Sequence, residues 1–145
     1  MKPALLALAG TLCLAPTLAT ATVTELEVGK TLKCQSTGPD RKLYVTIGRI
    51  ETHTDGRIVV SVSIYNRSPK SGLPELAHAA IDAGVLSASC PTPAGGPIPI
   101  SPNFEEGYQQ WRSAKGRVFT VSVDRIYDVL VDQVAKARQG GQGVQ

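Results

Sequence analysis

The sequence predicts an α+β domain with an antiparallel sheet of three to five strands, a central β-hairpin and two main helices packed on one face. Three observations lead to this fold class. Residues 42–53 and 57–66 alternate apolar and polar side chains on either side of a glycine-containing turn. Residues 101–116 and 122–138 repeat apolar side chains at helical spacing. The third observation is a pair of cysteines that can close one disulfide.

The first 21 residues have the pattern of a secretory signal peptide. Lys2 precedes an uncharged apolar run at 4–14, and Ala19, Thr20 and Ala21 form a small-residue cleavage site. The apolar run is too short to span a membrane, although an uncleaved membrane anchor is the alternative interpretation. We therefore expect cleavage after Ala21 and a location in the bacterial periplasm or outside the cell.

Cleavage would leave 124 of the 145 residues, enough for one domain with a modest core. It removes one of the 15 basic residues and none of the 12 acidic residues, so the formal charge becomes +2. This near balance gives no electrostatic reason to expect nucleic acid or an anionic membrane as a partner. No second long apolar run follows, so we expect no stable membrane insertion after cleavage. The domain is predicted over 22–138 and a disordered tail over 139–145.

Cys34 and Cys90 remain in the mature chain. In an oxidising compartment an isolated pair most simply forms one disulfide, which is the pairing predicted here. A pair of buried or reactive thiols is the alternative.

The length of the hairpin loop follows from which residues can be buried. A two-residue loop would place the apolar residues of the second strand opposite charged residues of the first, which burial forbids. A three-residue loop of Thr54, Asp55 and Gly56 instead places Ile58 opposite Thr52. Gly56 can adopt the positive φ that this turn requires.

A β-bulge is predicted at Gly48 and Arg49 in the first hairpin strand. Apolar positions before this dipeptide are odd-numbered, whereas the apolar position after it is even-numbered. One extra residue in this strand restores a common buried face. The expected pairs are then Ile47 with Val62 and Val45 with Ile64.

The remaining short elements are predicted from turn and capping residues. Asp82 is expected to cap a short helix that runs through Ser89. The proline-rich stretch 91–102 is predicted to be an extended connector that packs Ile98 and Ile100 against the body. Strands are predicted near 30–35, at 76–81 and at 117–123.

An aromatic helix is predicted after the proline-rich connector, capped by Ser101 or Asn103 and stopped by Gly116. Phe104, Tyr108 and Trp111 recur at helical spacing and are three of the seven aromatic residues of the chain. As a structural stripe they would pack on the sheet, with Phe104 and Trp111 buried and the Tyr108 hydroxyl at the surface. In the functional interpretation, Trp111, Arg112 and Tyr108 would form an exposed binding hot spot for a protein or glycan. Because so few aromatics are available, we favour the structural interpretation.

A last helix is predicted with Ser122 as its N-cap and an apolar stripe that includes Ile126 and Leu130. The block 104–130, FEEGYQQWRSAKGRVFTVSVDRIYDVL, resembles the C-terminal part of a loose group of small exported bacterial proteins. The resemblance covers about a fifth of the chain and implies no activity and no functional residue. It supports an aromatic helix, a short strand and a final helix as one unit.

Catalytic and metal-binding patterns are weak in this sequence. Glu51, His53 and Asp55 alternate toward the hairpin end and could hold a metal, although a solvated strand face has the same residues. His78 stands among alanines, where a structural histidine is a simpler explanation than a catalytic base. No motif for nucleotide binding, zinc-peptidase or serine-hydrolase chemistry occurs. We assign no catalytic residue, metal ligand or cofactor.

These features predict a small exported envelope protein that is a non-enzymatic binding or inhibitory module. The alternatives are a small periplasmic hydrolase that uses His78 or His53, or a metal carrier. The expected partner is an envelope protein or a glycan. The candidate interaction surface consists of His53, Asp55, Arg57, Tyr108 and Arg112.

Overall fold

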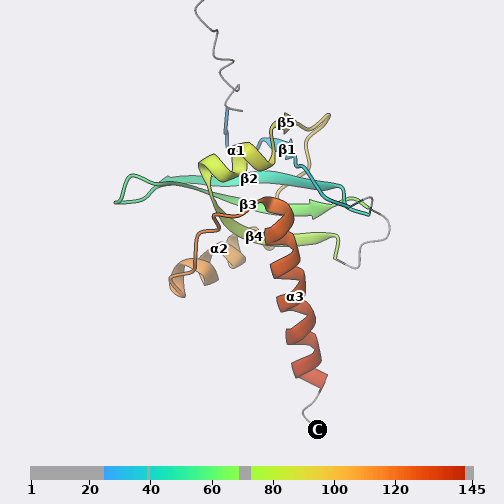
Figure 1. The fold of residues 1–145 in the computed structure, drawn as a ribbon. Helices are drawn as coiled ribbons and strands as arrows, with labels where there is room; N and C mark the ends of the chain where they lie inside the picture. Colours follow the sequence, from blue (N-terminus) through green and yellow to red (C-terminus); the bar gives the residue numbers. More distant parts are fainter. Residues whose placement is uncertain (1–24, 39, 69–72, 143–145) are drawn as a thin grey trace, which may run out of the picture.

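A five-stranded antiparallel sheet lies at the centre of the molecule (Figure 1). The computed structural model describes residues 25–38, 40–68 and 73–142. The sheet order is β4-β3-β2-β1-β5, so four consecutive strands form a meander and β5 returns to pair with β1. The predicted α+β class with a central hairpin is confirmed. The strands are β1 (Thr31–Lys33), β2 (Leu43–Thr52), β3 (Ile58–Asn66), β4 (Glu75–Asp82) and β5 (Thr92–Pro93).

The predicted three-residue hairpin loop is confirmed. Thr52 lies opposite Ile58. The His53 N–H donates to the Arg57 carbonyl at 2.8 Å and closes the loop. Gly56 has a φ of 84°, the left-handed conformation that the turn requires.

The predicted bulge is confirmed as well. Val45 lies opposite Ile64 and Ile47 opposite Val62, and the register then shifts before Arg49. The extra residue, Gly48, lies against the ring of Phe104, where a Cβ would come within 2.3 Å of a ring carbon. The bulge therefore maintains the buried face of the hairpin and also makes room for an aromatic ring on the other face.

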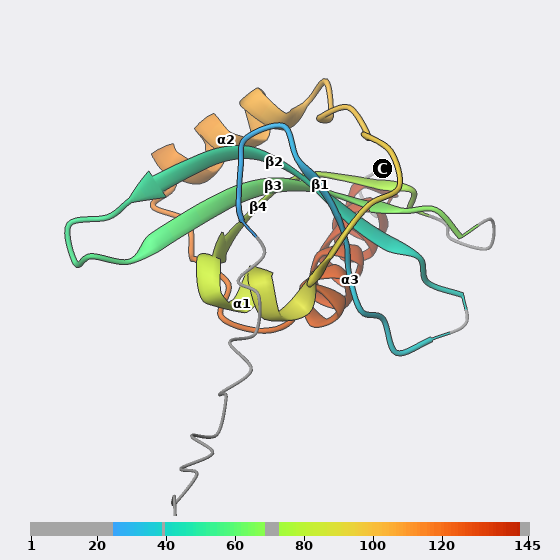
Figure 2. The ribbon, with the colours of Figure 1, turned by 90° about the horizontal axis from the view of Figure 1, so that it is seen from above.

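Helices cover both faces of the sheet (Figure 2). α1 (Ala83–Ser89) and α3 (Val123–Gln142) lie on one face, and α2 (Phe104–Ser113) lies on the opposite face. The expectation that the two main helices share a face is therefore wrong. The reason lies in β3, where Ser61 and Ser63 are buried instead of facing solvent. Their hydroxyls bond to His78 and to the Ala77 carbonyl, so a strand with alternating serines is buried on both sides.

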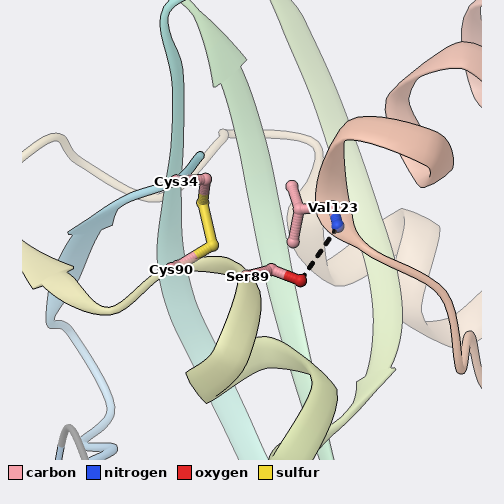
Figure 3. Close-up of a disulfide and its surroundings, with 4 residues drawn as sticks. All are labelled: Cys34, Ser89, Cys90 and Val123. Atoms are coloured by element: carbon pink, nitrogen blue, oxygen red, sulfur yellow. Dashed lines mark hydrogen bonds between the residues drawn. A yellow bond between two sulfur atoms is a disulfide. The ribbon is translucent and has the colours of Figure 1, made fainter. Parts of the chain in front are cut away.

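The disulfide between Cys34 and Cys90 confirms the predicted pairing (Figure 3). It joins the residue after β1 to the end of α1, across a sequence separation of 56. Asp82 caps α1 as predicted, because its carboxylate accepts from the N–H groups of Gly84 and Val85. Ser89, next to the disulfide, accepts from the first N–H of α3 at 3.3 Å. The disulfide and the Ser89 hydrogen bond therefore connect the end of β1, the end of α1 and the start of α3.

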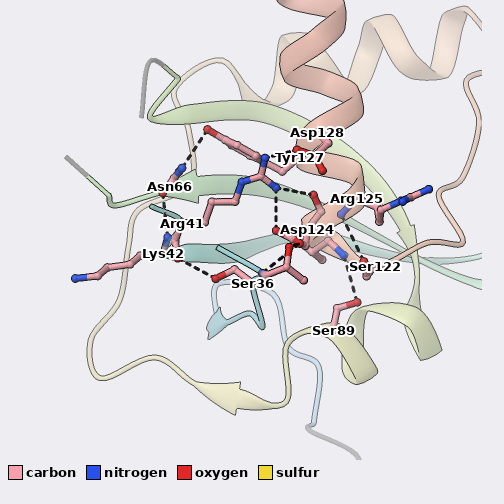
Figure 4. Close-up of polar contacts among 12 residues, drawn as sticks. Ser36, Arg41, Lys42, Asn66, Ser89, Ser122, Asp124, Arg125, Tyr127 and Asp128 are labelled. Atoms are coloured by element: carbon pink, nitrogen blue, oxygen red, sulfur yellow. Dashed lines mark hydrogen bonds and ion pairs between the residues drawn. The ribbon is translucent and has the colours of Figure 1, made fainter. Parts of the chain in front are cut away.

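α3 begins as predicted, since the Ser122 hydroxyl accepts from the Arg125 N–H. Figure 4 shows Arg41 between two carboxylates of the first turns, Asp124 and Asp128. Burial acts to raise the pKa of Asp124, but hydrogen bonds from Thr37 and Arg41 outweigh it, so this pKa lies below its ordinary value. The helix continues to Gln142, beyond the predicted domain end at 138 and into the expected tail.

The stretch 117–123 does not form the predicted strand. Residues 114–122 connect α2 on one face to α3 on the other and therefore pass around the β4 edge of the sheet. Phe119 makes a single parallel bridge with Ile81, with hydrogen bonds of 2.8 and 3.0 Å to the β4 backbone. The alternation does not mark a buried face, because Phe119 is half-buried while Val121 is 44% exposed.

The proline-rich connector borders the opposite edge of the sheet. Ile98 is buried as predicted, and its backbone bonds to the Thr31 and Thr46 hydroxyls. Ile100 is 37% exposed, contrary to expectation. The predicted signal peptide lies outside the described residues. Within the described ranges, none of the helices combines the length and apolar character needed to cross a bilayer.

Candidate functional site at the α2 face

The aromatic residues of α2 pack on the sheet, with one exception to the expected pattern. Phe104 is 6% and Tyr108 is 1% exposed, whereas Trp111 is only half-buried. Ser101 accepts from the Asn103 N–H near the helix start, while Asn103 makes no side-chain cap. Lys115, with a φ of 50°, takes the left-handed position expected of Gly116. The structural interpretation therefore holds for two rings, and the third lies at the surface.

His78 of β4 is the centre of this aromatic packing. Its ring centroid lies 5.5 Å from that of Phe104, 5.7 Å from Tyr108 and 5.5 Å from Trp111. Gly107 allows α2 to come this close, since a Cβ there would lie 2.8 Å from the His78 Cβ. Burial lowers the pKa of His78 to about 4, against the opposing effect of Glu51, so the imidazole is neutral at pH 7.

Tyr108 is fixed by polar partners at both its hydroxyl and its ring. The hydroxyl donates to Glu51 of β2, and this hydrogen bond is the largest cause of the raised pKa of Tyr108. The Arg49 guanidinium lies over the ring at 4.3 Å and pairs with Glu105 at 2.7 Å. Tyr108 therefore does not present its hydroxyl to water, and its place in the predicted interaction surface is a wrong expectation.

Ser61 and His78 are the residues that a hydrolase would need. The His78 Nε2 atom lies 3.0 Å from the Ser61 Oγ atom. Ser61 is only 3% exposed, because it lies in an inner strand beneath α2. The carboxylate of Glu51 bonds to Tyr108. A serine with no access for a substrate cannot attack a carbonyl, so this contact is a buried hydrogen bond of the core.

The three residues suggested as metal ligands have different roles. Glu51 accepts from Tyr108, and the Asp55 carboxylate accepts from the Arg57 N–H at 2.9 Å within the hairpin loop. The part of the chain that the structure describes holds no cluster of three or more histidine, cysteine or acidic side chains arranged for a metal.

A hollow of about 750 Å³ separates the hairpin from the end of α2. We call it the hairpin hollow. Within it the structure brings together two predicted surface residues, His53 and Arg112, with Asp55 and Arg57 exposed at the hairpin tip. Its lining consists of Glu51, Thr52, His53, Thr54, Trp111, Arg112, Lys115 and Gly116.

Trp111 forms one wall of the hairpin hollow in a fixed position. Its indole Nε1 donates to the Arg117 carbonyl at 3.0 Å. Gly116 packs so closely that a Cβ would come within 2.1 Å of the ring. Sequence reasoning left Trp111 and Lys115 out of the predicted surface. One feature of the sequence could have indicated that Trp111 is partly exposed. Trp111 lies in the last turn of the predicted helix, at the end of the aromatic stripe.

No protein-family model matches this chain, and no curated protein or solved structure is significantly similar to it. The resemblance of residues 104–130 to exported bacterial proteins therefore stays a prediction.

Proposed function

We propose that the mature protein is a non-enzymatic binding module of the bacterial envelope, and that the hairpin hollow holds an acidic segment of a protein partner. The observation that carries the proposal is the position of a half-buried tryptophan next to two exposed cations, Arg112 and Lys115, in one hollow. Tryptophan and arginine are the residues most enriched at the energetic centres of protein interfaces.

The local charge favours an acidic partner. Residues 107–123 contain Arg112, Lys115 and Arg117 and no aspartate or glutamate. Glu51, the carboxylate that lines the hairpin hollow, accepts a hydrogen bond from Tyr108. Among the described residues Arg112 and Lys115 take part in no ion pair, so a carboxylate from a partner could pair with both.

The cellular location is supported by two independent features. The sequence begins with an export signal pattern. The Cys34–Cys90 disulfide fits an oxidising compartment such as the periplasm. Chemistry supports binding over catalysis, since the serine and histidine that contact each other lie under α2.

The test compares the mature protein with an Arg112→Glu/Lys115→Glu variant, each immobilised and incubated with envelope extract. The matched control, Lys33→Glu/Lys42→Glu, makes the same charge change at exposed positions on and beside strands β1 and β2. We expect the wild type and the control to retain the same discrete protein at low salt, and the hollow variant to lose it. Equal retention by the hollow variant would exclude this surface, and no retained protein at any salt concentration would contradict the binding module.

A further inference from the structure

A second groove runs along β4, on the other side of Trp111 from the hairpin hollow. We call it the edge groove. Its floor is Leu76–Ala79 of β4, one wall is α2 at Gly107, Gln110 and Trp111, and the other wall is α3. Its volume is about 740 Å³. Trp111 lines both hollows, so one partner chain can cross from one to the other.

The floor of the edge groove is an open edge of the sheet. β4 is the outermost strand at this side. Phe119 bonds to the backbone of Ala80 and Asp82 but reaches no further along the strand. Among the described residues, no other segment makes a backbone hydrogen bond to the outer side of 76–79. Unpaired backbone groups of this kind accept an added strand.

The two edges of the sheet differ in how they are protected. β5 is a two-residue strand that contains Pro93, and further prolines follow it. Proline removes the N–H that an added strand would need. β4 contains no proline; Phe119 covers its end near Ile81, and a bulge opposite Ser63 interrupts the rest of the strand. Because the bulge limits regular pairing to a short stretch, the two helices have to provide most of the contact with a bound segment.

α3 supplies an apolar wall that the described residues leave partly exposed. The helix extends well beyond the β4 edge (Figure 1). Val129 is 42% exposed, and Leu130, Val134 and Ala137 continue the same stripe along the groove. Helices in proteins are stabilised mainly by the packing of such a stripe. The exposed part of the α3 stripe is therefore available to a binding partner.

The charges around the edge groove identify the occupant. Arg117 lines it, and Arg138 extends the basic character along α3, while Asp132 is already paired with Lys136 at 2.9 Å. A second copy of this chain would add its own Arg117 and Arg138 to the charges of the interface. An extended acidic segment instead complements them.

We infer that the edge groove binds an extended acidic segment of the protein partner, with its backbone beside β4, its apolar side chains on Val129 and Trp111, and a carboxylate at Arg117. This inference rests on the proposed function and extends it, because the same segment can continue past Trp111 into the hairpin hollow.

The inference is tested with random phage-displayed peptides of about ten residues, selected on the immobilised mature protein. We expect enriched peptides to combine β-branched residues with aspartate or glutamate. Their affinity should fall about tenfold with Arg117→Glu and with Val129→Ser, both at exposed side chains. N-methylation at alternate peptide positions should weaken binding by a similar factor, since it removes backbone donors.

The matched control is the Lys33→Glu/Lys42→Glu variant, whose exposed side chains line neither hollow and which should bind edge-groove peptides within about threefold of the wild type. This separates the two proposals, because no envelope extract is involved. Peptides without carboxylates, or peptides that bind both groove variants unchanged, would overturn the inference. A dimer in sedimentation equilibrium that Val129→Ser dissociates would overturn it too, since a second copy would then fill the groove.

Discussion

The two faces of the central sheet are buried by different kinds of residue (Figure 2). Under α1 and α3 the core is almost entirely aliphatic, with Val60, Val62 and Ile64 of β3 packed against Leu86 and Ile126. Under α2, aromatic rings and polar side chains join buried aliphatic residues such as Val59 and Ala80. The aromatic and polar groups include Phe104, Tyr108, Trp111, His78, Ser61 and Glu51.

The aliphatic face contributes mainly to stability, whereas the α2 face determines where particular side chains lie. Aliphatic packing is non-directional and stabilises the fold in proportion to the area buried. Hydrogen bonds and ring contacts need particular partners in particular places. The α2 face therefore holds Trp111 in a fixed position beside the hairpin, and both hollows lie along it. The predictions below test this division, from the largest effect to the smallest.

Removal of the disulfide should have the largest effect on stability. In the Cys34→Ala/Cys90→Ala variant we expect a loss of about 4 kcal/mol in the free energy of unfolding, because the cross-link closes a long loop in the unfolded chain. Urea unfolding at pH 7 measures it. A loss below about 1 kcal/mol would show that the aliphatic face holds the fold without its cross-link.

Gly107→Ala should destabilise the fold by about 1–3 kcal/mol, although alanine favours helices. The added Cβ would lie 2.8 Å from the His78 Cβ and push α2 off the sheet. The matched control is Gly140→Ala in α3, where no atom lies within 4 Å of the added Cβ. That control should be neutral or up to about 1 kcal/mol more stable. A stabilised Gly107→Ala variant would contradict the close contact.

The α2 face should make stability pH-dependent through His78. Its folded pKa is about 4 against an ordinary value of 6.5, so between these values the unfolded chain binds a proton that the folded chain does not. The free energy of unfolding should be highest above pH 6.5 and fall by about 1–2 kcal/mol as the pH is lowered toward 4. This range allows for the partial exposure of His78.

Urea unfolding at pH 7.5 and 4.5 checks this, with His78→Gln as the variant that lacks the effect. The contribution of Asp124, whose pKa is lowered from 3.8, is lost only as the pH falls below that value and stays outside this window. An identical pH dependence in the wild type and in His78→Gln would show that burial does not lower the pKa of His78.

The smallest effect on stability is expected for Arg112→Glu/Lys115→Glu. Exposed cations at a helix C-terminus contribute about 0.3–1 kcal/mol each, so the loss should be about 1 kcal/mol or less. Circular dichroism during thermal unfolding measures it. A much larger loss would mean that these cations support the fold, and the loss of binding by this variant could then not be assigned to the surface.

The parts of the fold that the sequence predicts are those that burial, local capping chemistry or the cysteine content determines. The three-residue loop and the bulge follow from the positions of the apolar residues, because any other register would bury charges. The cap of α1 at Asp82 follows from local chemistry. The pairing of Cys34 with Cys90 follows from there being two cysteines in the mature chain.

The α2 face was not predictable in the same way. Ser61 and Ser63 have the pattern of solvent-facing residues, and only partners far along the chain make their burial favourable. Tyr108 and Glu51 are 57 residues apart, and nothing local indicates their hydrogen bond. The hairpin hollow joins 51–54 to 111–116 for the same reason. The sequence therefore predicts its separate residues but not the hollow they form.

The most direct test of the central claim is site-specific photocrosslinking in cells that produce the full-length protein. A photoreactive amino acid replaces Thr54 beside the hairpin hollow, Gln110 beside the edge groove, or Ala88 on α1 at the opposite face. All three positions are exposed. We expect the same partner adduct from Thr54 and Gln110 and none from Ala88. An adduct from Ala88 alone, or equal adducts from all three, would contradict binding at the α2 face.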